Sequence, residues 1–267
     1  GIAEFSTGLS MGEDADRLAA RWRVSRGEQD EYALASHLRA AAARQAGRFD
    51  DQVEPVRLPP NFSPIEHDNG IREDTSLEKL GKLPPAFVRP YGTITAGNAS
   101  FLTDGAAVVL LASEKAARSE GLPIRARIVD SVNTAQDPEM QLLMGPALAV
   151  CRLLQRNRLR ISDIDAFEFH EAFAGQVLAN LKALADEEFL QRTVGEAQTA
   201  AEIPADRLNR WGGSLSIGHP FGATGARLVS TAIHRLETEG GRLAVATSCA
   251  AGGLGSAILI EKEPEER

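Results

Sequence analysis

The second part of the chain alternates short apolar runs with segments whose apolar residues recur at helical spacing. The apolar runs predict strands at 106–112, 124–135, 164–170, 241–249 and 255–262. Helices are predicted between them at 113–121, 145–159, 171–189 and 223–240. This alternation indicates an α/β fold in which helices cover a largely parallel sheet. The run 106–112 contains only Ala, Val and Leu, which indicates a strand buried on both faces.

The first part of the chain divides into a helical stretch and a long irregular one. Residues 12–46 are predicted to be helical, with Ser25 as an N-cap and Gly47 at the end. Residues 48–104 hold seven of the thirteen prolines and few periodic segments. An irregular stretch of this length in a compact protein is more often functional than idle.

Composition excludes several classes of protein. The 267 residues suit one large or two smaller domains, and a net charge of −8 argues against nucleic acid as the main partner. No apolar run approaches the roughly 18 residues of a membrane span, and residues 1–12 lack the pattern of a signal peptide. Two cysteines, Cys151 and Cys249, allow neither a disulfide framework nor a Cys-rich metal site. We therefore expect no metal, a reducing compartment and a cytoplasmic location.

His219 lies directly before a proline and among glycines, within the stretch 211–227. Glycines let backbone N–H groups approach a ligand closely, and a histidine there can act as a base or as a donor to an oxyanion. The alternative is a buried histidine in a tight turn. The density of glycine favours a functional role, because glycine weakens a fold where close approach is not needed.

His170 and Glu171 follow the predicted strand 164–169, just where a helix begins. Loops at the carboxyl ends of strands frame the ligand crevice of open α/β sheets. The alternative is a helix start in which the histidine caps and the glutamate favours the helix dipole. A zinc-protease HExxH motif is excluded, because position 174 is Ala.

The two cysteines occupy different environments. Cys249 ends an apolar strand before a glycine-rich turn, where nearby backbone N–H groups would favour a lowered pKa and a reactive role. The alternative for Cys249 is a buried, inert thiol. Cys151 lies within an apolar helix, and we expect it to be structural.

Six segments together resemble the thiolase family, over about residues 2–262. The segments are MGEDADRLAARWRVSRGEQDEYALASH (11–37), DNGIR (68–72), YGTITAGNASFLTDGAA (91–107), HEAFAGQ (170–176), NRWGGSLSIGHPFGATGAR (209–227) and SCAAGGLGSAILIE (248–261). Most thiolases have Asn at the position of His170. The histidine, with EFST and LTDGAA, is most similar to the acetyl-CoA acyltransferase (3-ketoacyl-CoA thiolase) β subunits of fatty-acid β-oxidation multienzyme complexes.

The resemblance implies a thiolase-like layered αβαβα fold, represented by the loop region and the C-terminal half. It predicts a loop and CoA-binding region at 1–103, the last strand and helix of an otherwise absent N-terminal half at 104–122, and the C-terminal domain at 123–267. The nucleophilic cysteine of the family belongs to that N-terminal half, and neither cysteine here matches it. We expect a fragment, a split protein or a truncated sequence, and no thiolysis by this chain alone.

The implied reaction is CoA-dependent cleavage of a 3-ketoacyl-CoA to acetyl-CoA and a shortened acyl-CoA. Coenzyme A is a co-substrate, and no permanently bound cofactor is expected. By resemblance, His219 activates the nucleophile, Cys249 is the second acid and base, and His170 contributes to an oxyanion hole. The backbone N–H of Ala251 belongs to a second oxyanion hole, at a position where many thiolases have Gly.

The resemblance also assigns residues that bind the substrate. Ser100 matches a residue near the pantetheine, and Arg72 matches one that meets an adenosine phosphate. Phe101 replaces a glycine of short-chain thiolases, which favours a different acyl pocket for medium or long chains. We expect a homodimer or higher oligomer and a hydratase/dehydrogenase α subunit as a further partner.

Three alternatives stay open. Decarboxylating ketoacyl synthases share the fold family, but they have no cysteine at the position of Cys249. A non-catalytic CoA- or lipid-binding module would keep the pocket without the nucleophile. A scaffold subunit would use the loop region to dock a partner.

Overall fold

A computed structural model describes residues 3–195 and 200–263, and its centre is a four-stranded sheet of order β3-β6-β5-β4. The strands are β3 (Ala126–Ala135), β4 (Ala166–Phe169), β5 (Leu243–Ala250) and β6 (Leu254–Lys262). β4 and β5 are parallel, whereas β6 runs antiparallel to both β5 and β3. The expectation of a largely parallel sheet is therefore wrong. The short turn 251–253 between β5 and β6 allows only an antiparallel pair, because parallel neighbours need a long crossover.

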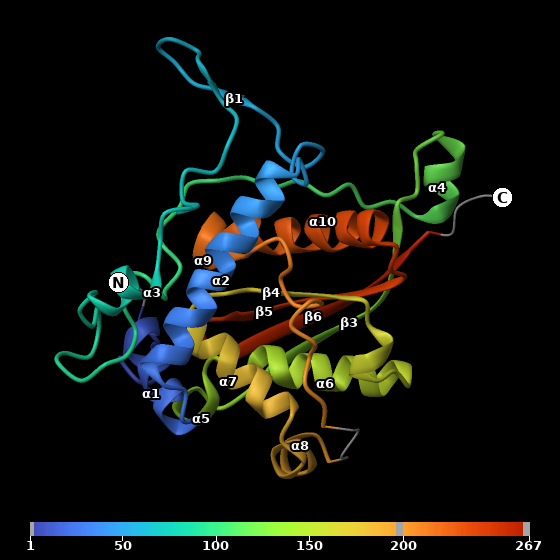
Figure 1. Ribbon diagram of the computed structural model, residues 1–267. Coiled ribbons are helices and arrows are strands. Elements are labelled where there is room, and N and C mark those ends of the chain that lie inside the picture. Colours follow the sequence, from blue (N-terminus) through green and yellow to red (C-terminus); the bar gives the residue numbers. More distant parts are fainter. Residues whose placement is uncertain (1–2, 196–199, 264–267) are drawn as a thin grey trace.

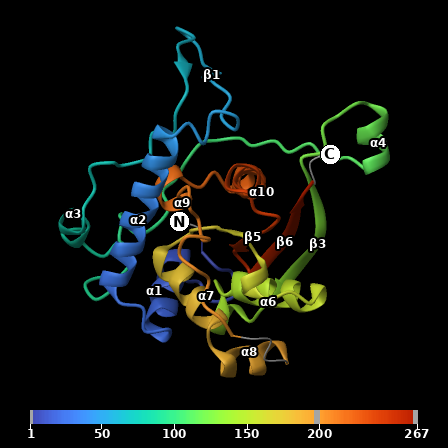
Figure 2. The ribbon, with the colours of Figure 1, turned by 45° about the vertical axis from the view of Figure 1, so that its right-hand side comes forward.

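Helices cover both faces of this sheet (Figures 1 and 2). α10 (Phe221–Glu239) lies on one face, and α6 (Gly145–Asn157) and α7 (Ala174–Leu184) lie on the other. Along β4, Ala166 packs in the apolar cluster of α10, while Phe167 and Phe169 pack in the larger cluster on the opposite side. Every residue of β4 is buried, because helices cover both faces of the sheet at this strand.

The helices α1 (Met11–Arg21) and α2 (Arg26–Gln45) confirm the helical prediction for 12–46. Ser25 is the N-cap of α2, and it forms a capping box with Glu28. α1 packs on α7, and α2 packs on α7 and on α9 (Ser214–Ile217). These contacts bring the N-terminal helices to the end of the sheet where β4 terminates.

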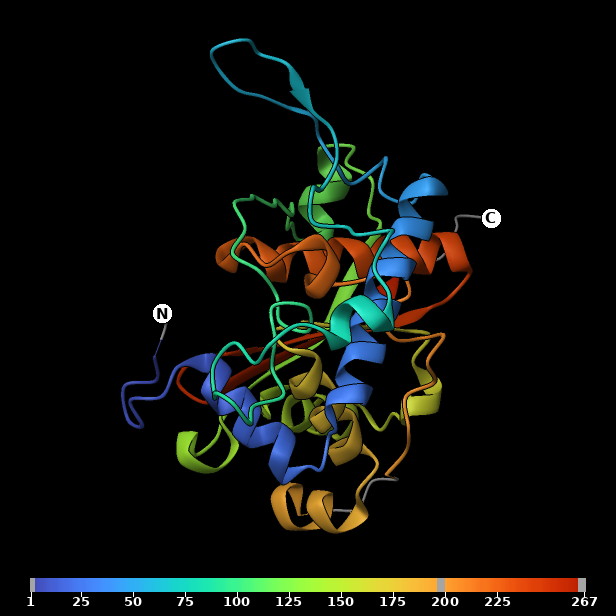
Figure 3. The ribbon, with the colours of Figure 1, turned by 60° about the vertical axis from the view of Figure 1, so that its left-hand side comes forward.

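The remaining elements are short. They are α3 (Leu77–Gly81), α4 (Glu114–Ser119), α5 (Pro138–Gln141), α8 (Glu187–Val194), a 3-10 turn (Ile161–Asp163), β1 (Val56–Arg57) and β2 (Pro64–Ile65). The irregular character expected for 48–104 is confirmed, and the β1–β2 hairpin projects from the body of the molecule (Figure 3). None of the helices within the described ranges has the length and apolar character needed to cross a membrane.

The segment 106–112 forms no strand, which contradicts the prediction of a buried one. Val108 is 92% exposed, and Leu110 and Leu111 are 74% and 69% exposed. A strand requires a neighbour for its backbone hydrogen bonds, and no strand among the described residues pairs with this segment. The short helix expected after it is present as α4.

Candidate active site

His170 and Cys249 lie at the same edge of the sheet, as their positions at strand ends predict. Phe169 pairs with Thr247 in the parallel β4–β5 ladder, and the backbone N–H of His170 continues it by donating to the Thr247 carbonyl at 2.8 Å. Cys249 follows two residues later in β5. The carboxyl ends of two parallel neighbours thus carry both candidate residues.

His219 joins this edge from the loop before α10. Gly218 adopts φ 108°, and a Cβ built there would lie 2.4 Å from Oγ1 of Thr103, so the position requires glycine. The backbone N–H of His219 donates to that Thr103 oxygen at 3.1 Å. The rings of His219 and His170 lie with centroids 4.0 Å apart at an interplanar angle of 36°. The structure therefore brings together the two histidines that the sequence singles out.

Both histidines are held in the neutral form. Burial, followed by the charge of Arg227, lowers the pKa of His219 to about 4. Burial, the adjacent His219 and Arg227 lower the pKa of His170 well below its usual value. His170 is only 2% exposed. At neutral pH both imidazoles are uncharged, so each can exchange a proton with a substrate.

Hydrogen bonds fix the orientation of the His219 ring. Its Nδ1 lies 2.7 Å from Oγ1 of Thr224, and the Thr224 hydroxyl donates its single proton to the Pro220 carbonyl at 3.2 Å. The Thr224 oxygen is therefore the acceptor, and Nδ1 of His219 carries the ring proton. Nε2 of His219 is left as a proton acceptor, which is the state that a general base needs.

Cys249 is buried, and its thiol stays protonated. Burial raises its pKa to about 12. The expectation of a lowered pKa is wrong, because desolvation of the thiolate outweighs the nearby backbone N–H dipole. A protonated thiol at this position can act as an acid. Cys151 lies buried in α6, as its apolar surroundings predict, and burial raises its pKa as well.

The turn after Cys249 contains Ala251, whose backbone N–H the resemblance assigns to an oxyanion hole. Positive φ values fall on Gly252 (84°) and Gly253 (69°) and not on Ala251, so the alanine Cβ causes no strain there. Ala251 is exposed. The N–H of Gly252 donates to the Glu4 carboxylate at 2.8 Å, which anchors the turn from the other end of the chain.

Ser100 and Phe101 run alongside the two histidine loops. The backbone N–H of Ser100 donates to the Ala172 carbonyl at 2.9 Å, two residues after His170. The Phe101 ring packs on Gly70, where a Cβ would lie 2.0 Å from the ring. The structure thus places both residues next to the candidate site.

Arg72 lies on the surface, two residues after Gly70. Its backbone N–H donates to Nδ1 of His37 at 3.2 Å. No ion pair within the described part of the chain involves its guanidinium. The exposed side chain is therefore accessible to an anion.

A buried polar network around Glu171, next to the histidines, does not follow from the sequence patterns. The Glu171 carboxylate accepts from Tyr32 at 3.0 Å, Ser36 at 2.8 Å, Asn209 at 2.7 Å and the Leu215 N–H at 3.1 Å. With four donors, Glu171 ties α2 to the loop before α9 and is not a helix cap. The sequence singles out Glu171 beside His170 at the strand end, but no local pattern identifies its distant partners.

The contacts of Ser214 and Arg227 with His170 were not predicted from the sequence either. The Ser214 hydroxyl lies 2.9 Å from Nδ1 of His170, and Nη2 of Arg227 donates to the same oxygen at 2.9 Å. Both residues belong to the glycine-rich segment that contains His219. In that segment, the sequence does not distinguish side chains that form hydrogen bonds from residues that only determine the backbone conformation.

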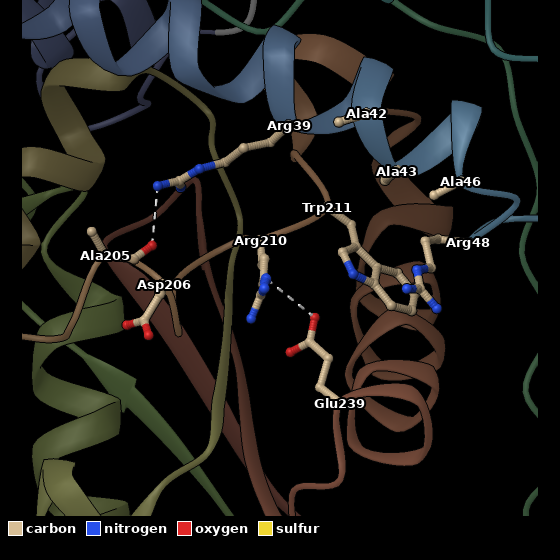
Figure 4. A pocket seen from close by; sticks show the side chains of 10 residues that line it. All are labelled: Arg39, Ala42, Ala43, Ala46, Arg48, Ala205, Asp206, Arg210, Trp211 and Glu239. Carbon is tan, nitrogen blue, oxygen red and sulfur yellow. Dashed lines mark hydrogen bonds and ion pairs between the residues drawn. The ribbon is translucent and has the colours of Figure 1, made fainter.

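A pocket lies away from the histidine pair, between α2 and the end of α10 (Figure 4). It has a volume of about 540 Å³ and is bounded by the second half of α2, the segment 205–211 and the end of α10. Trp211, Arg48 and Arg210 line it, whereas His170, His219 and Cys249 do not. This pocket is therefore separate from the candidate site.

The free energy of unfolding is expected to fall as the pH decreases from about 6.5, the usual pKa of histidine. Between that value and the pKa of about 4 for folded His219, the unfolded chain binds more protons than the folded chain. We expect a loss of about 1–3 kcal/mol, moderated by the partial exposure of His219. Urea unfolding measured across this pH range tests it. In the double variant His170→Asn/His219→Gln, the free energy of unfolding should depend less on pH over this range. An equal pH dependence in the wild type and the double variant would contradict the lowered pKa values of these histidines.

His170 and Cys249 at the ends of two parallel strands, with His219 from the loop before α10, form a cluster in an α/β protein that is suited to acid–base chemistry. The thiolase N-terminal domain model matches residues 1–115, and the thiolase C-terminal domain model matches residues 122–262. The chain belongs to the thiolase family.

Individual relatives agree with this assignment. The mitochondrial trifunctional enzyme β subunit of Mus musculus is 50% identical over 264 residues, which cover 99% of this chain and 55% of that protein. A probable 3-ketoacyl-CoA thiolase of Caenorhabditis elegans is 50% identical over 97% of this chain and 58% of its own length. The chain thus spans little more than half of the curated relatives that it matches.

Solved structures confirm the thiolase-like layered fold. The Bacillus anthracis acetyl-CoA acetyltransferase superposes with a TM-score of 0.85 at 36% identity, covering 98% of this chain and 62% of that chain. Human mitochondrial 3-ketoacyl-CoA thiolase in complex with CoA superposes with a TM-score of 0.83 at 34% identity, covering 98% of this chain and 61% of that chain. The expectation of a cytoplasmic location is contradicted, because the matching trifunctional enzyme β subunits are mitochondrial.

Proposed function

We propose that the chain forms the acid–base half of a 3-ketoacyl-CoA thiolase, an acetyl-CoA C-acyltransferase of fatty-acid β-oxidation. The observation that carries this proposal is the His170–His219 pair, 4.0 Å apart and neutral, at the strand edge that also holds Cys249. Because the chain spans 55% of the mouse relative, the complete reaction is proposed for an enzyme that also supplies the family's nucleophilic cysteine.

The proposed division of the chain supports this assignment. Residues 1–103 form the loop and CoA-binding region, 104–122 belong to the N-terminal half, and 123–267 form the C-terminal domain. The exposed apolar segment 106–112 supports the middle boundary, because in isolation it has no sheet to join.

The first half of the reaction forms an acyl-enzyme. Nε2 of His219 accepts the proton of the nucleophilic thiol, and the resulting thiolate attacks the keto carbon of the 3-ketoacyl-CoA. Cleavage of the adjacent carbon–carbon bond leaves an acyl thioester on the enzyme and an enolate of acetyl-CoA. The Cys249 thiol protonates the enolate carbon, which fits a group whose pKa is raised to about 12. His170 and His219 donate to the enolate oxygen as charge develops on it.

The second half transfers the acyl group to CoA. The Cys249 thiolate takes the proton of the CoA thiol, and the sulfur attacks the acyl-enzyme. The N–H of Ala251, in the exposed turn, donates to the oxyanion of this step. The nucleophilic cysteine leaves as a thiolate, which takes back the proton held by His219, and a shortened acyl-CoA is released.

Binding of CoA is proposed for Arg72, Ser100 and Phe101. Arg72 offers an exposed guanidinium to a phosphate, and Ser100 lies beside the loop of His170. Phe101 would shape an acyl pocket for medium or long chains. Coenzyme A is a co-substrate in this proposal, and no permanent cofactor takes part. A homodimer or higher oligomer and a hydratase/dehydrogenase partner are proposed, and the name of the mouse relative supports a multienzyme assembly.

A protein consisting of residues 1–267 alone is expected to lack thiolysis activity. Cys151 is enclosed in α6, and Cys249 is a protonated thiol assigned to acid–base work, so neither supplies the nucleophile. The assay follows the loss of 3-ketoacyl-CoA enolate absorbance, first alone and then with the nucleophile-bearing N-terminal segment of a relative. Turnover by the chain alone would contradict the proposal that another part of the enzyme supplies the nucleophile. Tight CoA binding without turnover in the complemented protein would favour a non-catalytic CoA-binding module.

A further inference from the structure

We propose that Ser214 and Arg227 are positioning residues that hold His170 in the tautomer protonated at Nε2. For its catalytic meaning the inference rests on the proposed thiolase function, in which His170 donates to an oxyanion. The structural part, the location of one proton, stands on the hydrogen bonds alone.

Arg227 determines the direction of the hydrogen bonds around Ser214. A guanidinium is always a donor, so Oγ of Ser214, 2.9 Å from Nη2 of Arg227, accepts from it. Ser214 is 0% exposed, so bulk water does not compete for its hydroxyl proton. The second partner of that oxygen is Nδ1 of His170 at 2.9 Å. The hydroxyl therefore donates to Nδ1, which must be the unprotonated nitrogen of the ring.

His170 carries one ring proton, because burial and the charge of Arg227 disfavour the imidazolium. With Nδ1 accepting from Ser214, that proton lies on Nε2. None of the hydrogen bonds of the described residues uses Nε2 of His170, so the N–H is available to a ligand. The two adjacent rings then differ: Nε2 of His170 donates, whereas Nε2 of His219 accepts.

The charge of Arg227 is well placed to maintain this state. Its Nη1 atom is buried without a hydrogen-bond partner among the described residues, so the serine is a main anchor of the guanidinium. The carboxylates of Glu168, Glu171 and Asp68 act on Arg227 through space and compensate its charge. Arg227 in turn disfavours protonation of both histidines. One cation thus orients the serine and keeps the imidazole neutral.

The tautomer decides what His170 offers to the enolate. A ring protonated at Nε2 presents a donor to the developing oxyanion, whereas the other tautomer presents a lone pair that repels it. Loss of one such donor lowers kcat by about 10²–10³-fold. In the complemented enzyme, an equal mixture of tautomers in Ser214→Ala is therefore expected to lower kcat about 2-fold with little change in KM, and complete conversion to the Nδ1-protonated form would lower it by the full factor.

The decisive experiment records long-range ¹H–¹⁵N correlations of the imidazole rings in the ¹⁵N-labelled 267-residue chain. His170 is assigned by the loss of its signals in His170→Asn. We expect wild-type His170 to be neutral and protonated at Nε2 from pH 6 to 8. Ser214→Ala and Arg227→Met should each convert it to a mixture of tautomers. Thr224→Val, which removes the partner of His219, should leave the His170 signals unchanged.

Several outcomes would overturn the inference. Protonation of wild-type His170 at Nδ1 would do so directly. An unchanged His170 tautomer in folded Ser214→Ala and Arg227→Met would do so as well, with the His37 and His234 signals serving as a check of folding. Since the readout needs neither substrate nor turnover, a failure of the thiolase proposal would leave this result intact.

Discussion

Thiolysis is expected to fall by about 10²–10⁴-fold when His219 is replaced by alanine in the complemented enzyme. Nε2 of His219 is the acceptor that takes the proton of the nucleophilic thiol, because Nδ1 is bonded to Thr224 at 2.7 Å. A pKa of about 4 keeps this nitrogen unprotonated over the physiological range. Without it, the nucleophile remains a thiol and the acyl-enzyme forms slowly. The measurement is kcat/KM for thiolysis, together with mass spectrometry of the acylated protein after rapid quenching.

His67→Ala is the matched control, since His67 is an exposed histidine in the irregular stretch and should leave the rate unchanged. Phe221→Ala tests a different possibility, that the ring of His219 needs its aromatic neighbour at 4.8 Å. Its effect should be small and confined to the orientation of the imidazole. A His219→Ala enzyme that acylates as fast as the wild type would remove His219 from the role of base.

Local sequence patterns predict the elements of this fold well, but not their pairing. Ser25 caps α2 as expected, because a capping box depends on residues three apart. The direction of β6 does not follow from its apolar run, since buried parallel and antiparallel strands have the same composition. The turn 251–253 decides it, and the sequence marks that turn only as flexible. The segment 106–112 has the composition of a buried strand, yet a strand forms only where another strand pairs with it.

The candidate site was predictable where it depends on strand ends and was missed where it depends on distant contacts. His170 and Cys249 follow apolar runs, so their shared edge could be inferred from the pattern. The bond between Ser36 and Glu171 joins residues 135 positions apart, and no local pattern predicts it. The pKa of Cys249 was expected in the wrong direction, because the degree of burial is set by the packing of β5 against its neighbours and not by the turn beside it.

Removal of one partner of the Glu168–Arg235 ion pair is expected to destabilise the chain by about 3–5 kcal/mol. Both side chains are 0% exposed, and Nη1 of Arg235 lies 2.7 Å from Oε1 of Glu168. The same nitrogen also donates to the carbonyls of Phe167 at 3.3 Å and Arg207 at 3.1 Å. Arg235→Met removes the hydrogen-bonded counter-charge of the buried Glu168 carboxylate beside β4, so that only the charge of Arg227 acts on it through space. The Phe167 and Arg207 carbonyls then keep only their backbone N–H donors. Urea unfolding followed by circular dichroism gives the change in the free energy of unfolding.

The matched control is Arg242→Met, which breaks the surface pair with Glu261 and should cost less than about 1 kcal/mol. The double variant Glu168→Leu/Arg235→Met should recover much of the loss, because it removes both buried charges together. If Arg235→Met were no more destabilising than Arg242→Met, the pair would be dispensable for the β4–α10 contact. A large loss in the single variant with recovery in the double variant would show that the cost lies in the unpaired charge. Since His170 directly follows β4, the same experiment tests whether the strand that positions this histidine depends on the pair.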